Sequence, residues 1–401
     1  MRYPAMWRRF MAIQYGRFRT RLLLSTLVLL AGCAATFTPV PAVNSLDALQ
    51  VSADRKVTPE QALANIELPA LIELNDDMRD WVDRYVRSAR NPRTRLELLH
   101  SSLRSGALHG LDYDVDADGS AQQAFVNGKA NCLAYANLLV GMARYAGLDA
   151  DYQLLTLRPD FSRFGTRVAV QQHVNVLVTL RDSSRYSVDL DPPPRDAVSA
   201  SRALKDREAF ALYHNNLAMN YLRSDDLEPA YGHALQALSL SPQSEFLWIN
   251  LGVVYSRSGQ ISASAQSYHQ ALALNPDAGS AMNNLLVLHS RAGDTRQADY
   301  WEQAVADHQQ RNPYYYVSLG EAAALNGELD EALVHYQEAI ARKDSDPEFY
   351  FSIARLYLEL QQPQLSIEYA EKAIEHAVLM QQRREYEAFL SQLTDATLAA
   401  L

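Results

Sequence analysis

A 34-residue period in the second half of the chain constrains its fold more than any other feature of the sequence. The period runs from residue 211 to residue 380 without slippage. Its seventh position holds only large aliphatic residues: Leu217, Leu251, Leu285, Leu319 and Ile353. Its eighth position holds mostly small residues: Ala218, Gly252, Leu286, Gly320 and Ala354. A period of this length predicts an array in which each repeat buries its apolar face on its neighbours.

Individual motifs within the period identify its type. Trp248-x-x-Leu251-Gly252-x-x-Tyr255 is followed by Asn275-Pro276 in the same repeat. This arrangement resembles the tetratricopeptide repeat (TPR), which implies five helix pairs at 211–244, 245–278, 279–312, 313–346 and 347–380. Residues 381–401 are predicted to form a capping helix that covers the last apolar face. The third repeat departs most from the pattern, with Leu286, His289 and Glu302 at unusual positions.

The resemblance to TPR proteins implies a concave groove lined by the first helix of each pair. By analogy the candidate protein-binding residues are Asn215, Phe246, Asn283, Tyr314 and Phe351, with Met219 and Arg355 beside them. Aromatic residues at these positions also serve as packing between repeats, so both roles stay open. The Lys and Asn that form the basic clamp for carboxyl-terminal tails in this family are missing, which argues against a ligand of that kind.

Cys132 is one of only two cysteines in the chain. It stands at the start of a helical pattern that runs from Leu133 to Ala146. The dipole and free N–H groups at a helix N-terminus favour the nucleophilic thiolate, so we expect a thiol pKa below the ordinary value. The alternative is a small buried hydrophobic residue, which is how most lone cysteines behave.

Two predicted strands follow the cysteine. His173 lies in the β-branched run 171–180, and Asp189 lies in the short run 186–191, which stops at three prolines. The order of cysteine on a helix, histidine on a strand and aspartate on the next strand is compatible with nucleophilic catalysis. In such a site a base activates the thiol and a third group orients the base.

This order, with C-x-x-Y-A after the cysteine and V-D before a proline-ended strand, resembles the transglutaminase-like superfamily of papain-type cysteine enzymes. The resemblance covers residues 95–195. It implies that Cys132 is the nucleophile, His173 the general base and acid, and Asp189 the residue that orients the imidazole. Asp191 is the rival for the last role, because it would share a strand face with Asp189. Val174 and Asn175 stand where the family commonly carries an aromatic residue.

Other candidate sites are weaker. His100 falls in a helical run and His109 follows it, and both are expected to be structural. The run 114–119 resembles the opening of a calcium loop, but Phe125 occupies the position that should supply a glutamate. We therefore expect a solvated acidic turn before a helix capped by Ser120, with no metal ion or cofactor.

The N-terminus predicts export. Six arginines precede the apolar run 22–30, which is too short to span a membrane and closes on Leu30-Ala31-Gly32-Cys33. That ending resembles a bacterial lipobox, which implies a lipoprotein signal peptide over residues 1–32 and lipid on Cys33. Ala34 would direct the lipoprotein to the periplasmic face of the outer membrane. An uncleaved anchor is the alternative, and Met6 or Met11 could be the true start.

Loss of the signal peptide removes six arginines and no acidic residue, so the formal net charge changes from −10 to −16. Such a surface repels nucleic acid and anionic lipid, which leaves the lipid on Cys33 as the membrane partner. Residues 33–56 are predicted to be a flexible tether. The transglutaminase-like domain is assigned to residues 57–206, beginning at a capping box that starts with Thr58.

The predicted fold class is an α+β papain-like, transglutaminase-like domain followed by an all-α TPR solenoid. The predicted function is that of a lipid-anchored cysteine enzyme that acts on amide or peptide carbonyls through an acyl-enzyme. In this hypothesis the TPR groove recruits a protein or peptide substrate. The alternative is a catalytically inactive lipoprotein that serves as a protein-interaction scaffold.

Overall fold

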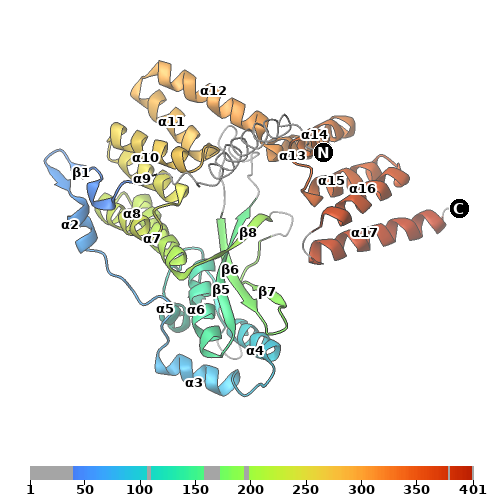
Figure 1. Ribbon diagram of the computed structural model, residues 1–401, viewed down its shortest axis with the longest axis horizontal. Helices are drawn as coiled ribbons and strands as arrows, with labels where there is room; N and C mark the ends of the chain where they lie inside the picture. Colours follow the sequence, from blue (N-terminus) through green and yellow to red (C-terminus); the bar gives the residue numbers. More distant parts are fainter. Residues whose placement is uncertain (1–38, 106–109, 158–171, 194–197, 378–379, 400–401) are drawn as a thin grey trace, which may run out of the picture. The chain divides into compact units, whose positions relative to one another are not determined.

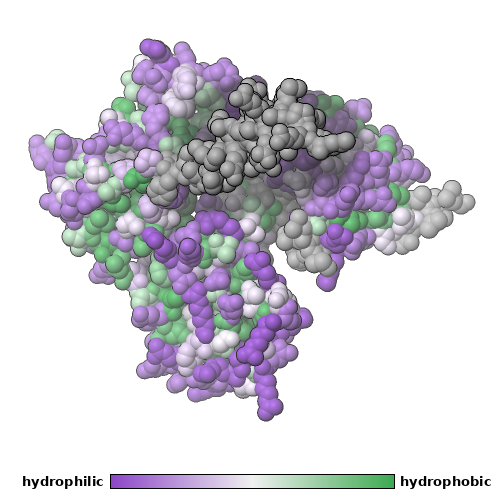
Figure 2. All heavy atoms as spheres, in the orientation of Figure 1, coloured by the Kyte–Doolittle hydropathy of each residue, from purple (hydrophilic) through white to green (hydrophobic). Residues whose placement is uncertain are grey.

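The computed structural model describes residues 39–105, 110–157, 172–193, 198–377 and 380–399 (Figure 1). The predicted signal peptide, Cys33 and His109 lie outside these residues. None of the described helices has both the length and the apolar character that a membrane crossing needs. The face of the molecule in Figure 2 is mostly hydrophilic, with smaller apolar patches between the polar side chains.

The N-terminal segment is more ordered than the sequence predicts. It forms a 3-10 turn η1 (Val43–Ser45), strands β1 (Leu49–Ser52) and β2 (Arg55–Val57), and helix α2 (Pro59–Ala64). The Thr58 capping box that precedes α2 is present, with both its hydrogen bonds. The prediction of a flexible tether over residues 33–56 is therefore wrong for the hairpin and for η1.

Contacts with the repeats explain why this segment is ordered. Leu49 is fully buried, and the carbonyl oxygen of Asp47 accepts hydrogen bonds of 2.6 Å from the hydroxyls of Tyr231 and Tyr255. The side-chain amide of Gln260 donates to the carbonyl of Ala48 at 2.9 Å. These partners are 184 to 212 residues away in the sequence, so no local pattern predicts them.

The domain that follows packs helices on one antiparallel sheet. The sheet has the order β7-β6-β5-β8, with bounds β5 (Asp149–Leu157), β6 (Gln172–Thr179), β7 (Arg185–Val188) and β8 (Val198–Leu204). Helix α6 (Cys132–Tyr145) lies against β5 and β6, and eleven of its fourteen residues are buried (Figure 1). The other elements before the sheet are α3 (Asp76–Tyr85), α4 (Pro92–Arg104), β3 (Asp112–Tyr113), α5 (Ala121–Asn127) and β4 (Lys129–Ala130).

Five antiparallel helix pairs and one further helix complete the described chain. Their bounds are α7 (Asp206–Arg223), α8 (Leu227–Leu240), α9 (Glu245–Arg257), α10 (Ile261–Leu274), α11 (Gly279–Ala292), α12 (Thr295–Arg311), α13 (Pro313–Leu325), α14 (Leu329–Arg342), α15 (Pro347–Glu359), α16 (Pro363–His376) and α17 (Met380–Ala399). The predicted fold class, a mixed α/β domain followed by a helical repeat array, is confirmed.

The glycine at position eight of the second and fourth repeats sets how closely the two helices of the pair approach. A β-carbon added at Gly252 would lie 2.5 Å from the ring of Tyr268, and one at Gly320 would lie 2.8 Å from the ring of Tyr336. Both tyrosines are buried and cannot move aside easily. In these two repeats the glycine therefore makes room for an aromatic ring on the partner helix.

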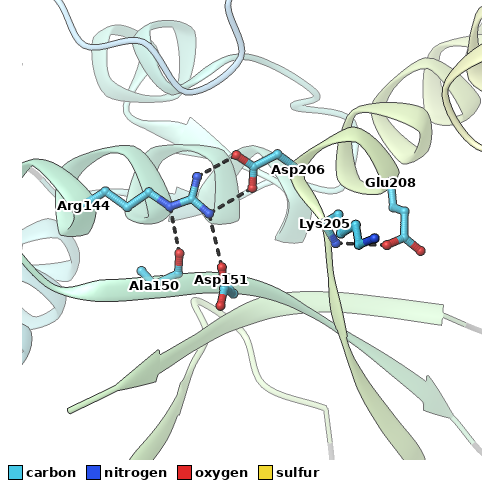
Figure 3. Close-up of polar contacts among 6 residues, drawn as sticks. All are labelled: Arg144, Ala150, Asp151, Lys205, Asp206 and Glu208. Atoms are coloured by element: carbon cyan, nitrogen blue, oxygen red, sulfur yellow. Dashed lines mark hydrogen bonds and ion pairs between the residues drawn. The ribbon is translucent and has the colours of Figure 1, made fainter. Parts of the chain in front are cut away.

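An arginine of α6 connects the sheet domain to the first repeat helix. Arg144, near the end of α6, makes two hydrogen bonds of 2.6 and 2.9 Å to the carboxylate of Asp206, the first residue of α7 (Figure 3). Its guanidinium also donates to the carbonyl of Ala150 and to Asp151 on β5. A planar guanidinium can serve three partners in this way because its donors are fixed in one fork.

Candidate active site

Cys132 is the first residue of helix α6. The preceding Asn131 caps this helix, because its side-chain oxygen accepts a hydrogen bond of 2.9 Å from the backbone N–H of Ala134. The two-residue strand β4 and the cap fix the backbone directly before the cysteine. The thiol therefore starts from a rigid position at the helix N-terminus.

Burial dominates the environment of the thiol. Backbone N–H groups of Val174 on β6 and of Leu133 interact with the sulfur and lower the pKa, but burial outweighs them and raises the pKa of Cys132 above its ordinary value of 9.0. Asp189 raises it further. The prediction of a lowered thiol pKa is therefore wrong in direction, because packing against β6 partly shields the sulfur from water and so disfavours the thiolate.

His173 and Asp189 form a hydrogen-bonded pair. The Nε2 atom of His173 lies 2.6 Å from Oδ2 of Asp189, and both side chains are largely buried. Asp189 directly follows β7 rather than lying within it. The register of β6 and β7 pairs Val176 with Val188. Its continuation places Asp189 opposite Asn175, which is two residues from His173 and lies on the same face of the sheet.

Asp191 does not take the orienting role. Its side chain is exposed, and its backbone N–H donates a hydrogen bond of 3.2 Å to the other carboxylate oxygen of Asp189. Of the two aspartates, only Asp189 contacts the imidazole in the described residues. The bond to Nε2 leaves the Nδ1 atom of His173 as the ring nitrogen that could face a thiol.

The structure brings Cys132 to the neighbour of His173 rather than to the imidazole. The sulfur interacts with the Val174 amide, and no hydrogen bond joins it to His173 among the described contacts. Asp189, the hydrogen-bond partner of His173, is close enough to the sulfur for its charge to raise the pKa of Cys132. The three predicted residues therefore converge on one end of β6, but only two of them are bonded.

His100 on α4 lies near the His173–Asp189 pair and lines a cavity with Asp189. Its Nδ1 atom is 2.6 Å from the hydroxyl of Tyr135 on α6, and burial lowers its pKa. The cavity has a volume of about 450 Å³ and is also lined by Asn175. The side-chain oxygen of Asn175 is buried without a partner in the described residues.

Asp118 is a contact residue that the sequence analysis missed. Its carboxylate accepts hydrogen bonds from Asn131 at 2.5 Å, from Asn216 at 3.0 Å and from Asn220 at 2.8 Å. The last two residues belong to α7, so the acidic turn is a junction between the cysteine's helix cap and the first repeat. The prediction of a merely solvated turn is wrong, and only the Ser120 cap after it is as expected.

One cavity of about 990 Å³ joins the cysteine to the repeats. Its walls include Cys132 and Val174 on one side, and residues of α7, α9 and α11 on the other. The predicted groove residues Asn215, Phe246 and Asn283 line it.

The other two predicted groove residues lie elsewhere. Tyr314 packs against Phe349 and bonds to Asp346. Phe351 is buried against Tyr386 and Phe389 of α17. For these two residues the packing role applies.

Comparisons with known families agree with the two-part architecture. The profile of the transglutaminase-like superfamily matches residues 79–175, which include Cys132 and His173, and that of the tetratricopeptide repeat matches residues 209–377. A comparison with curated proteins found no match.

Solved structures similar to this chain include TPR proteins. YrrB, described as a TPR protein with an unusual peptide-binding site, has 17% identity and a TM-score of 0.23, over 44% of this chain and 92% of its own. MamA from Desulfovibrio magneticus RS-1 has 16% identity and a TM-score of 0.25, over 43% of this chain and 97% of its own. PilF from Pseudomonas aeruginosa has 15% identity and a TM-score of 0.25, over 48% of this chain and 87% of its own. The chain thus combines a transglutaminase-like domain with a following array of tetratricopeptide repeats.

Proposed function

We propose that this protein is a cysteine-dependent enzyme that acts on amide or peptide carbonyls of protein substrates held by its repeats. In the proposed reaction the Cys132 sulfur attacks the carbonyl carbon while His173 accepts the thiol proton at Nδ1. The imidazolium then donates that proton to the leaving amine or ammonia, and a thioester joins the acyl group to the cysteine. Water or a second amine attacks the thioester and releases the thiol.

The observation that carries this proposal is the shared cavity. The thiol opens into the same space as the groove of α7, α9 and α11, so a segment bound by the repeats would have a carbonyl within reach of it. The hydrogen bond of 2.6 Å that the Asp189 carboxylate accepts from Nε2 supports the role of His173 as a base. It also stabilises the imidazolium that proton transfer would create.

A direct test is turnover of a chromogenic small amide and of a protein amide by the full chain. Cys132→Ala should abolish both activities. Deletion of residues 211–401 removes the repeats, which are expected to bind the substrate far from the reacting bond. If that deletion variant folds, it should keep activity on the small amide and lose most activity on the protein. Equal activity of the Cys132→Ala variant and the parent chain would refute the proposal.

A scaffold without catalysis is the second candidate. Two observations favour it: burial raises the pKa of the Cys132 thiol, and no hydrogen bond joins the sulfur to His173 in the described residues. In a cell-based complementation assay this candidate predicts that Cys132→Ala behaves as wild type. Loss of the repeats would then reproduce the null phenotype.

The proposed location is the periplasmic face of the outer membrane, with lipid on Cys33 as the anchor. The support is the run of arginines, the short apolar segment and the Leu30-Ala31-Gly32-Cys33 sequence. A Cys33→Ser variant made in a Gram-negative host should leave the membrane fraction. Retention in that fraction at the wild-type level would refute the anchor.

A further inference from the structure

Two histidines meet inside the first helix pair, and the proposed reaction uses neither of them. The Nδ1 atom of His214 on α7 lies 3.0 Å from the Nδ1 atom of His233 on α8. The ring planes differ by 26° and the ring centres are 5.3 Å apart, so the two imidazoles meet edge to edge. At this distance one nitrogen carries a proton and donates it to the lone pair of the other.

Aromatic rings enclose this pair. His214 is 2% exposed, and the ring of Tyr213 packs edge-on against its imidazole. The ring of Tyr221 lies parallel to the imidazole of His233, with 5.5 Å between the ring centres. Burial, and for His214 also the neighbouring His233, lowers the pKa of each imidazole to about 4.

No counter-charge is available to a protonated pair. Asp118, in the turn before α5, acts on Tyr213 of α7. Asp47 and Glu60, in the N-terminal segment, act on Tyr231 of α8. Helices α6 and α9 and strand β5 also pack on α7, but no carboxylate, lysine or arginine in the described chain interacts with either imidazole. A buried imidazolium without an anion is costly, so a proton binds better when the two helices are apart.

The effect of pH on this contact has a definite sign. A histidine that is exposed to water titrates near 6.5, which is above the folded value of about 4. The contact is therefore fully stable above pH 6.5 and loses stability as the pH falls from 6.5 toward 4. Between about pH 7 and pH 5 the two groups together raise the equilibrium constant for opening on the order of 10²-fold.

Helix α7 is also the part of the repeats that bonds to the sheet domain. Its first residue, Asp206, accepts two hydrogen bonds from Arg144 of α6 (Figure 3). Further along the helix, Asn216 and Asn220 donate to the carboxylate of Asp118. A change in how α7 packs on α8 therefore reaches the attachment of the repeats to the sheet domain.

We infer that the His214–His233 pair is an acid-sensitive joint, in which proton binding in mildly acidic solution separates α7 from α8 while α13 and α14 stay packed. The joint needs only protons as its ligand. It does not depend on the proposed enzyme activity.

Hydrogen exchange of the full chain, followed by mass spectrometry of peptic peptides, measures this opening directly. Exchange rates at pH 7 and pH 5 are divided by the intrinsic rates at each pH, which gives the open fraction of each helix. Peptides from α7 and α8 should be open at least tenfold more often at pH 5 than at pH 7. Peptides from α13 and α14 are the internal control, because their histidine, His335, has Glu331 at 3.6 Å as a counter-charge.

The matched variants replace histidine with phenylalanine, which keeps an aromatic ring but cannot bind a proton. The acid response of α7 and α8 should disappear in the double variant His214→Phe, His233→Phe. It should persist in His335→Phe. The single variant His233→Gln keeps a hydrogen-bonding group beside His214 and removes one proton site, so its response should be about tenfold smaller than that of the parent chain.

Two results would overturn the inference. One is an acid response of α7 and α8 that is the same in the double variant as in the parent chain. The other is an equal rise in the open fraction of α7, α8, α13 and α14 in the parent chain, which would show general acid destabilisation. The second result needs only the parent chain, so it decides the question even if the double variant does not fold.

Discussion

The hydrogen bond of 2.6 Å between Nε2 of His173 and Oδ2 of Asp189 decides which ring nitrogen remains available. With Nε2 committed to the carboxylate, Nδ1 is left to exchange a proton with a thiol. When Nε2–H donates to the carboxylate, Nδ1 can accept the proton of a thiol, and Asp189 fixes the orientation of the ring.

The first prediction concerns the two neighbouring aspartates. Asp189→Asn should lower kcat for amide turnover roughly 10²- to 10⁴-fold, because the amide can donate to Nε2 and so stabilise the wrong tautomer. Asp191→Asn is the control, since its exposed side chain does not contact the imidazole. Similar losses in the two variants would show that Asp189 has no special role.

The second prediction concerns the pH dependence of the thiol. Because burial raises the pKa of Cys132, the thiolate forms only as the pH rises past its ordinary value of 9.0. The rate of alkylation by iodoacetamide in the folded chain should therefore still be rising above pH 9. The same chain in urea should titrate near the ordinary value. A folded-state midpoint near pH 7 would contradict the burial argument.

The third prediction tests the junction at Asp118. Asp118→Ala removes three hydrogen bonds to a carboxylate and should lower the free energy of unfolding by about 2 kcal/mol. Asp116→Ala breaks one exposed ion pair with Arg223 and should cost less than about 0.5 kcal/mol. Urea denaturation of both variants measures the difference, and equal losses would remove Asp118 from the junction.

The fourth prediction concerns the helix contact in the second repeat. Gly252→Ala places a methyl group 2.5 Å from the Tyr268 ring and should destabilise the chain by about 1–3 kcal/mol. The same change in a Tyr268→Ala background should cost much less, because the ring is gone. Thermal unfolding of the four chains of this cycle gives the coupling energy. A coupling near zero would show that the contact does not limit helix approach.

The sequence predicts the repeats well because their packing is periodic. Gly252 and Gly320 recur at one position of a 34-residue period, so their close contacts are encoded locally. The order of Cys132, His173 and Asp189 is readable for a similar reason, since each residue sits in a recognisable helix or strand pattern.

Contacts between segments that are far apart in the sequence cannot be predicted from local patterns of this kind. The hairpin formed by β1 and β2 is held through the backbone carbonyl of Asp47, which has no side-chain signature. The Asp118 junction and the cavity shared with Asn283 depend on how the sheet domain meets α7. The raised thiol pKa has the same origin, because burial of the sulfur depends on tertiary packing.

In the proposed reaction Cys132 and His173 act together as nucleophile and base. Because burial raises the pKa of the Cys132 thiol, the proposed acylation at neutral pH needs His173 to remove the proton. The most direct measurement is the intact mass of the full chain after incubation with a thiol-directed acylating probe at pH 7. The wild-type chain should gain one acyl group, and His173→Ala and Cys132→Ala should gain none. An equal adduct on the wild-type and His173→Ala chains, or a wild-type adduct that appears only in denaturant, would contradict the account.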